Sequence, residues 1–303
     1  MARTGGHRAR RSLPAAAVVS LVTLGLLVGC GGGADDPGQA SATRSSSSAP
    51  SSTTTKPPPP TPPTSAPAST TPPEPPAPDR STPPPPVAPA FPGTLRGEDV
   101  TVIPTSRQLV ALTFDAGANS AGLPSILATL RDRQVSATFF LTGQWAAGNP
   151  AQVQAIRAAG HRVGNHSMNH AHFTQLSAAQ IGEQLSGAQQ AIQAAGADPR
   201  PLFRFPFGDR DARTIAAVND AGYLPVRWTV DTLGWKGTSG GMSAQQVSDL
   251  AVNALRPGAI VLMHIGSNPD DGTTLDADAL PGTIDRMRAA GYSFVTMDSL
   301  LAH

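Results

Sequence analysis

The sequence predicts an α/β fold, a distorted TIM-like barrel of the (β/α)7 type, over residues 94–303. Short apolar segments alternate there with segments of helical periodicity, and the alternation occurs seven times. The segments are apolar throughout, which is typical of a parallel sheet covered by helices. Eight strand–helix units take about 250 residues in a closed barrel, so this shorter domain fits seven. An open doubly wound sheet is the alternative, but no glycine-rich phosphate loop follows the first apolar segment.

Each expected strand is a run of aliphatic, aromatic and β-branched residues that ends at a polar or turn-forming residue. In chain order the expected strands cover residues 108–115, 135–141, 161–165, 202–205, 223–230, 259–263 and 292–297.

The helices between the strands are indicated by signals at their ends. Asn149 and Pro150 predict the N-cap and the first-turn proline of one helix, and Gly160 predicts where it stops. The Ser-x-x-Gln spacing of a capping box opens two others, at residues 177–180 and 243–246. In chain order the expected helices cover residues 124–133, 150–159, 177–196, 211–221, 243–255 and 279–290.

Residues 1–29 are expected to be a signal peptide. Several arginines precede an apolar run over residues 13–28, which is too short to be a dependable membrane span. The run ends in Leu-Val-Gly-Cys30, which resembles the lipobox of bacterial lipoproteins. The resemblance implies an exported chain with a lipid anchor at Cys30, on the outer face of the cell membrane. An ordinary secretory signal is the alternative. Cys30 is the only cysteine, so no internal disulfide is expected.

The composition then predicts a disordered linker over residues 30–93. Residues 34–92 hold 20 of the 31 prolines and very little that is apolar. Proline-rich chain rises about 3.1 Å per residue, so the segment reaches roughly 180 Å when extended. Such a tether suits an enzyme that is anchored in a membrane and acts in the cell wall, although a passive stalk is equally compatible.

The charge pattern argues against a nucleic-acid partner. The formal net charge of the chain is only +1. No basic face and no interleaving of aromatic with basic residues stands out in the domain. No nucleic acid is expected as a partner, and no protein partner is predicted.

Five of the expected strands end at or just before an ionisable or metal-ligating side chain. Parallel barrels carry their active sites at the carboxyl ends of the strands, so these side chains are predicted to share one rim. A single strand-end aspartate is more often a turn residue, and a single histidine is more often a core residue. Five strands together favour an active site. The ionisable or metal-ligating side chains are Asp115, His166, His170, Arg204, Asp231 and His264, and Pro206 lies beside Arg204 at the end of the fourth strand.

Five short motifs surround these residues. They are Thr-Phe-Asp-Ala-Gly at 113–117, His-Ser-Met-Asn-His at 166–170, Arg-Phe-Pro-Phe-Gly at 204–208, Asp-Thr-Leu-Gly-Trp at 231–235 and Leu-Met-His at 262–264. In this order they resemble the motifs of the polysaccharide deacetylases of the NodB-homology type, carbohydrate esterase family 4. The resemblance covers residues 109–301. It implies a hydrolase of a non-peptide carbon–nitrogen bond that removes N-acetyl groups from an amino-sugar polymer, and the tether favours cell-wall peptidoglycan.

The resemblance also implies a role for each residue. Asp115 is implied to be the general base that takes a proton from water, and Arg204 to hold its carboxylate. His264 is implied to be the general acid that protonates the departing amine. The implied substrate-binding residues are Trp235, Asp231 and Pro206.

His166 and His170 are implied to be the ligands of a divalent metal. Two imidazoles four residues apart can converge on one cation, and zinc is favoured because it accepts imidazole well. A metal there would polarise the acetyl carbonyl and acidify its water.

Two departures from the family pattern affect the metal and the acid. Ala116 stands where the family has an aspartate as third metal ligand, and Gly234 stands where it has the aspartate that tunes the acid histidine. The candidate replacement ligands are Asp115, Asn119 and the acidic loop 266–278, and we expect weaker metal binding. The alternative functions are a non-catalytic glycan-binding protein on the same barrel and a hydrolase of another non-peptide carbon–nitrogen bond.

Overall fold

The computed structural model describes residues 91–302. The predicted signal peptide, the lipidated Cys30 and the linker up to residue 90 lie outside the described residues. Within residues 91–302, no helix has the length and apolar character that crossing a membrane requires.

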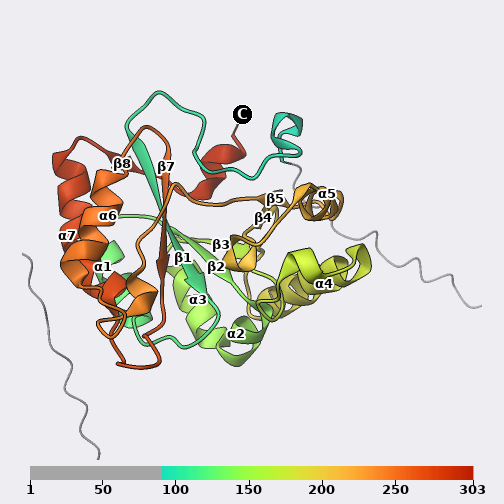
Figure 1. Cartoon of the computed structure of the whole chain (residues 1–303), viewed down its shortest axis with the longest axis horizontal. Coiled ribbons are helices and arrows are strands. Elements are labelled where there is room, and N and C mark those ends of the chain that lie inside the picture. Colours follow the sequence, from blue (N-terminus) through green and yellow to red (C-terminus); the bar gives the residue numbers. More distant parts are fainter. Residues whose placement is uncertain (1–90, 303) are drawn as a thin grey trace, which may run out of the picture. The chain divides into compact units, whose positions relative to one another are not determined.

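Eight parallel strands form one curled sheet at the centre of the domain (Figure 1). The order across the sheet is β5-β4-β3-β2-β1-β7-β6, and β8 pairs with the start of β1. The strands are β1 Leu109–Ala116, β2 Thr138–Leu141, β3 Arg162–Asn165, β4 Leu202–Phe203, β5 Leu224–Pro225, β6 Val230–Asp231, β7 Ala259–His264 and β8 Ser293–Phe294.

The expectation of one continuous strand over residues 223–230 is wrong, because this segment divides into β5 and β6 at opposite edges of the sheet. Pro225 has no amide hydrogen to continue the ladder. The Val226 amide still donates to the Phe203 carbonyl at 2.7 Å, whereas the Thr229 amide donates to the Ile260 carbonyl at 2.8 Å. One segment therefore joins both edges, and the sheet is the distorted (β/α)7 barrel that the sequence predicts.

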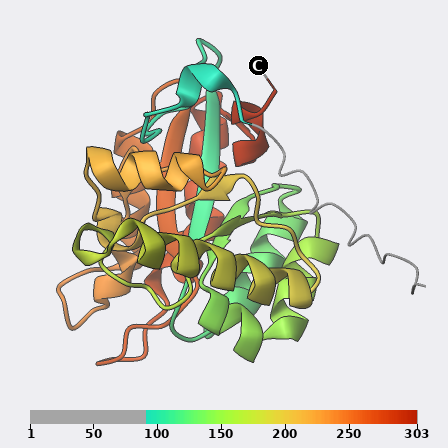
Figure 2. The ribbon, with the colours of Figure 1, turned by 90° about the vertical axis from the view of Figure 1, so that its right-hand side faces the viewer.

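The helices of the described residues pack around the sheet. They are α1 Leu123–Asp132, α2 Gly143–Gly148, α3 Pro150–Ala158, α4 Ala178–Ala194, α5 Ala212–Asp220, α6 Ala244–Asn253 and α7 Leu275–Ala289. Figure 2 shows α4 and α5 side by side in front of the sheet.

Most helix ends follow their sequence signals. In both predicted capping boxes the serine hydroxyl accepts a hydrogen bond from the amide three residues later. Asn149 precedes α3 but does not cap it, because its side-chain amide donates to the Trp145 carbonyl instead. Helix α7 begins at Leu275, a turn before the expected residue 279, and this places Asp276 in its first turn.

Side chains alternate along β1 between two buried clusters. Leu112 and Phe114 pack beneath the helices, whereas Ala111 packs inside the barrel. The alternation sends Asp115 to the interior side and Ala116 into the apolar cluster beneath the helices. The strand therefore delivers a carboxylate to the barrel mouth and buries its next residue among apolar side chains.

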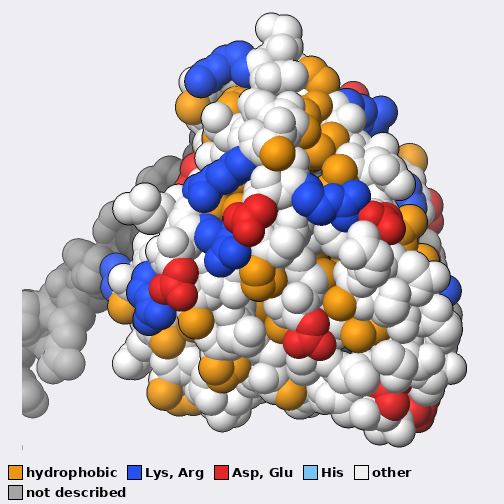
Figure 3. Space-filling view, turned by 90° about the vertical axis from the view of Figure 1, so that its left-hand side faces the viewer, with side chains coloured by type: hydrophobic (Ala, Val, Ile, Leu, Met, Phe, Trp, Pro, Cys, Tyr) orange, Lys and Arg blue, Asp and Glu red, His pale blue; other side chains and the backbone are white. Residues whose placement is uncertain are grey.

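The face over α6 and α7 carries charges of both signs close together (Figure 3). Arg286 of α7 pairs with Asp249 of α6 at 2.7 Å, and Arg133 after α1 pairs with Asp285 of α7 at 2.9 Å. Exposed pairs of this kind contribute little stability each.

His161, which precedes β3, makes the fold sensitive to acid. It is 8% exposed, its ring centre lies 5.3 Å from that of Phe139, and burial lowers its pKa from 6.5 to about 4. The unfolded chain thus binds this proton at a higher pH than the folded chain, and stability is lost as the pH falls from about 6.5 to about 4. We expect His161→Gln to lose less unfolding free energy than wild type between pH 7 and pH 4.5, measured by urea denaturation. An equal loss in both proteins would contradict this assignment.

Candidate active site

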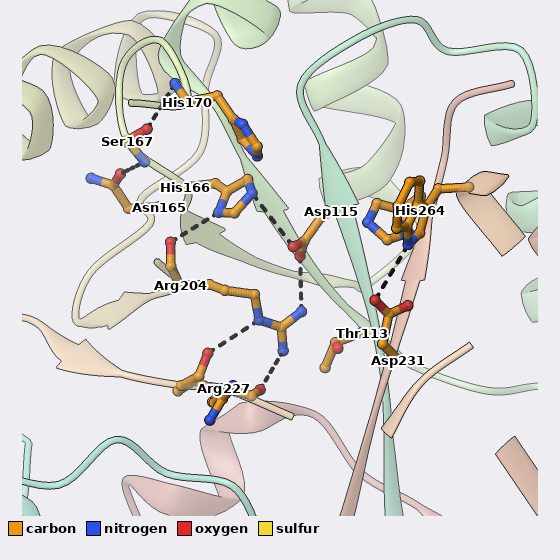
Figure 4. Close-up of polar contacts among 12 residues, drawn as sticks. Thr113, Asp115, Asn165, His166, Ser167, His170, Arg204, Arg227, Asp231 and His264 are labelled. Carbon is orange, nitrogen blue, oxygen red and sulfur yellow. Dashed lines mark hydrogen bonds and ion pairs between the residues drawn. The ribbon is translucent and has the colours of Figure 1, made fainter. Parts of the chain in front are cut away.

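A buried ion pair joins the ends of two separate strands at the barrel mouth (Figure 4). Asp115 lies near the end of β1 and Arg204 follows β4, and the arginine Nη1 donates to the aspartate Oδ1 at 2.8 Å. Their side chains are 8% and 0% exposed. Burial alone raises the pKa of Asp115, but Arg204, with His166 and His264, outweighs it and lowers the pKa below 3.8. The carboxylate is therefore ionised at neutral pH.

Arg204 is fixed on every side. Its Nε donates to the Val226 carbonyl at 3.1 Å, and its Nη2 donates to the Arg227 carbonyl at 2.9 Å. The guanidinium carbon lies 4.2 Å from the centre of the Phe140 ring. The arginine therefore sets both the charge and the position of Asp115.

His166 points to Asp115, and His170 lies beside it (Figure 4). His166 Nδ1 lies 2.9 Å from the Arg204 carbonyl oxygen, which only accepts, so Nδ1 carries the hydrogen and Nε2 keeps its lone pair. That Nε2 lies 3.4 Å from Asp115 Oδ2. Burial lowers the pKa of both imidazoles, that of His170 to about 4, so both are neutral at neutral pH.

The loop after β3 presents the two histidines through an irregular backbone rather than a helix. Ser167 and His170 have φ values of 68° and 62°, in the left-handed region that non-glycine residues seldom adopt. The Ser167 amide donates to Asn165 Oδ1 at 2.9 Å, and the His170 amide donates to Ser167 Oγ at 3.0 Å. These hydrogen bonds stabilise the strained loop. The loop places the ring centres of His166 and His170 4.9 Å apart.

The donors around the two imidazoles fall short of a complete metal site. Within residues 91–302, no group of three or more His, Cys, Asp or Glu side chains is arranged to hold a metal ion. A catalytic zinc normally has three protein ligands. His166 and His170 suit zinc chemically, but Ala116 offers no ligand. The amide oxygen of Asn119 already accepts from the Ser267 and Ala121 amides.

The acidic loop 266–278 is also largely committed to other contacts. Asp271 accepts hydrogen bonds from Thr238 and from the Ser239 and Thr273 amides. Asp276 turns to His264. Asp115, the remaining candidate, has its Oδ2 3.4 Å from His166 Nε2. It does not form a three-residue metal group with the two histidines, so within residues 91–302 the donor set fits two ligands of a metal and not the third.

His264 ends β7 and lies opposite Asp115 in the register of β1 and β7. Its Nδ1 lies 3.6 Å from Asp276 Oδ2. Burial lowers the pKa of His264, but the neighbouring carboxylates, first Asp276 and then Asp115 and Asp231, outweigh it and raise the pKa above 6.5. The sequence placed Asp276 only in an acidic loop. In the structure α7 starts earlier than expected, and its first turn brings Asp276 next to His264.

Trp235 lies at the rim, 48% exposed, in a short 3-10 helix, Gly234–Lys236. Its Nε1 donates to Asp231 Oδ2 at 3.3 Å, and the other oxygen of Asp231 accepts from the Leu233 amide at 2.9 Å. Asp231 therefore orients the tryptophan as well as facing the site.

Pro206 is buried, and its neighbour Phe207 is the exposed side chain of this motif, at 60%. Phe207 has a φ of 58°. Its ring stacks on that of His172, with ring centres 4.2 Å apart, and meets the ring of His170 edge-on, with ring centres 4.4 Å apart. The sequence did not single out Phe207 or His172. The exposure of an aromatic within the third motif follows from this left-handed backbone.

Known proteins resemble this chain in sequence and in fold. Residues 103–226 match the sequence model of the polysaccharide deacetylases. The chitooligosaccharide deacetylase of Bradyrhizobium sp. (strain ANU 289) is 32% identical over 185 residues, which are 60% of this chain and 81% of that protein. The chain belongs to the polysaccharide deacetylase family.

Other members differ in length and in activity. The peptidoglycan-N-acetylglucosamine deacetylase PgdA of Listeria monocytogenes is 33% identical over 210 residues, and the matched part is 69% of this chain but only 42% of that protein. A CE4 family pseudoenzyme from Bacillus anthracis has a TM-score of 0.58 at 31% identity, over 64% of this chain and 66% of that one. Members with this fold thus include both deacetylases and a pseudoenzyme.

Proposed function

We propose that this member of the polysaccharide deacetylase family removes N-acetyl groups from an amino-sugar polymer, with cell-wall peptidoglycan as the first choice. The observation that supports this most directly is a base and an acid on neighbouring strands, Asp115 on β1 and His264 opposite it on β7. The pKa of Asp115 is lowered and that of His264 is raised. At neutral pH, therefore, one group accepts a proton while the other readily carries one.

In the proposed reaction, Asp115 takes a proton from the water whose oxygen attacks the acetyl carbonyl carbon. The carbon–nitrogen bond breaks as His264 gives its proton to the departing amine nitrogen. Acetate and a free amino group result. Arg204 keeps Asp115 ionised and in place throughout.

We propose that the exposed Trp235 and Phe207 bind the sugar rings beside the scissile acetamide. Asp231 orients Trp235, and the buried Pro206 begins the 3-10 turn that presents Phe207. Exposed apolar side chains that surround a polar site are typical of ligand-binding surfaces. The two deacetylases named above are a peptidoglycan-N-acetylglucosamine deacetylase and a chitooligosaccharide deacetylase. We also propose that a lipid on Cys30 and the linker after it carry the enzyme from the outer face of the membrane into the cell wall.

We further propose that His166 and His170 bind a divalent cation, zinc in the first instance, more weakly than a three-ligand site. A bound cation would polarise the acetyl carbonyl and acidify its water. We expect the full chain to bind zinc in calorimetric titration, and the double variant His166→Ala/His170→Ala to lose that binding. His172→Ala, which removes a neighbouring exposed histidine, is the matched control. Equal and negligible zinc binding by the wild type and the double variant would contradict the proposal.

Ala116 supports a second candidate function, a glycan-binding protein without catalysis. It removes the third ligand that the family pattern provides, and the similar structure from Bacillus anthracis is that of a pseudoenzyme. Acetate release from peptidoglycan and from N-acetylglucosamine oligomers, measured together with glycan binding, distinguishes the two. Release supports the deacetylase, saturable binding without release supports the second candidate, and the absence of both contradicts both.

A further inference from the structure

Asp276 occupies the space that a side chain at position 234 would need. A Cβ atom on Gly234 would lie 2.4 Å from Asp276 Oδ1 and 2.5 Å from its Cγ. The two residues come from different elements, the 3-10 helix Gly234–Lys236 and the first turn of α7. A carboxylate at this point of the site can therefore come from a residue at position 234 or from one at position 276, but not from both.

The carboxylate of Asp276 is buried and held toward His264. Asp276 is 3% exposed. The Thr232 hydroxyl donates to its Oδ1 at 2.6 Å, and the His264 amide donates to its Oδ2 at 2.9 Å. The start of α7 also favours a negative charge at this point, because the helix dipole is positive there.

The imidazole of His264 has a donor position that faces this carboxylate. Its Nδ1 is buried and has no hydrogen-bond partner among the described residues, and it lies 3.6 Å from Asp276 Oδ2. This distance is only slightly longer than a hydrogen bond. A buried polar atom without a partner is costly, and Asp276 is the acceptor that relieves this cost.

We infer that Asp276 is the positioning residue of His264: it holds a proton on Nδ1, turns Nε2 toward the substrate, and supplies from α7 the carboxylate that is missing at Gly234. The inference rests on the proposed function for one consequence only, that Nε2 is the atom that protonates the departing amine.

Other charged groups also face His264. Asp115 of β1 and Asp231 of β6 favour its protonated form, as Asp276 does, while burial opposes it. His166 and His170, which follow β3, interact electrostatically with it as well. Among the carboxylates, Asp276 is the one that raises the pKa of His264 most.

The charge of Asp276 is tested by Asp276→Asn in the full chain. Asparagine has nearly the same shape and removes the charge, but its single oxygen can replace only one of the two carboxylate oxygens that accept from Thr232 and from the His264 amide. Circular dichroism therefore has to establish that the variant is folded. We expect the pKa of His264, followed by NMR of its ring protons, to fall by about 1 or more. The alkaline limb of acetate release should move to lower pH with it. Asp278→Asn, an exposed residue in the same helical turn, is the matched control and should change neither. An unchanged pKa in folded Asp276→Asn overturns the inference.

A relocation of the carboxylate gives the second test. Gly234 does not have the positive φ that excludes other residues, so an aspartate fits its backbone. We expect Gly234→Asp/Asp276→Gly to recover the His264 pKa and the activity that Asp276→Gly loses. A folded double variant without recovery of the pKa overturns the inference. Because the NMR measurement does not need turnover, a pKa shift in a protein that releases no acetate supports Asp276 and contradicts the proposed function alone.

Discussion

Replacing Asp115 with asparagine is expected to lower acetate release from an acetylated glycan by about 10²–10⁴-fold, the contribution of a positioned general base. Asparagine has nearly the same shape, and its oxygen can still accept from Arg204. It cannot, however, take a proton from water. Initial rates of acetate release from the same polymer, compared between wild type and variant, measure the effect.

The control for this variant must separate catalysis from folding. Without the charge of Asp115, Arg204 is a buried cation with no ionic partner, and some stability is lost. Circular dichroism and thermal melting establish that the variant is folded at the assay temperature. Asp249→Asn, on the exposed face of α6, also removes one carboxylate from an ion pair and should keep the wild-type rate. A folded Asp115→Asn protein with the wild-type rate would show that Asp115 is not the base.

The barrel could be predicted from sequence because its strands are apolar throughout and its helices carry clear end signals. The segment 223–230 shows the limit of that reasoning. Its pattern is that of one strand, but it changes partner from β4 to β7 part-way along. Periodicity within a segment says nothing about which neighbour each half pairs with, so the closure of the barrel appears only in three dimensions.

The residues of the candidate site that follow strands could be predicted from the sequence, whereas those that depend on a helix start or on one backbone angle could not. Asp115, His166, Arg204 and His264 lie together because parallel strands bring their carboxyl ends to one rim. Asp276 could not be assigned, because its position depends on where α7 begins, and the expected helix began only at residue 279. Phe207 depends on one left-handed residue, which composition does not reveal.

The two departures from the family pattern have different outcomes. The carboxylate missing at Gly234 has a replacement in space, since Asp276 fills the same position. For Ala116, the described residues show no such replacement. The Asn119 amide and the Asp271 carboxylate are engaged elsewhere, and Asp115 does not form a three-residue metal group with the two histidines. On the proposals above, the carboxylate beside the acid histidine is retained from another element while the third metal ligand is not, and we therefore propose a deacetylase with low metal affinity rather than a uniformly decayed site.

Arg204→Met is expected to lower the free energy of unfolding at pH 7 by about 3–5 kcal/mol, the typical cost of breaking a buried ion pair by removing one partner. Methionine fills part of the space over Phe140 but leaves the carbonyls of Val226 and Arg227 without their donor. Arg204→Lys keeps the charge, but lysine lacks the planar fork that reaches three acceptors. It should therefore also lose stability, though less. Urea denaturation of the three proteins measures both losses.

The dependence of this loss on pH identifies its cause. In wild type the pKa of Asp115 lies below its ordinary value of 3.8, so the pair stabilises the fold above that pH and the benefit disappears as the pH falls. In Arg204→Met, burial becomes the dominant influence and raises the pKa of Asp115. The free energy of unfolding of the variant therefore falls as the pH rises, because the buried carboxylate must ionise without a partner. The stability difference should thus be larger at pH 7 than at pH 4. Asp115→Asn/Arg204→Met should lose less than the sum of the two single variants, because no charge is left buried alone. A difference that is equal at both pH values, with additive losses, would mean that Arg204 acts through packing and not through the charge of Asp115.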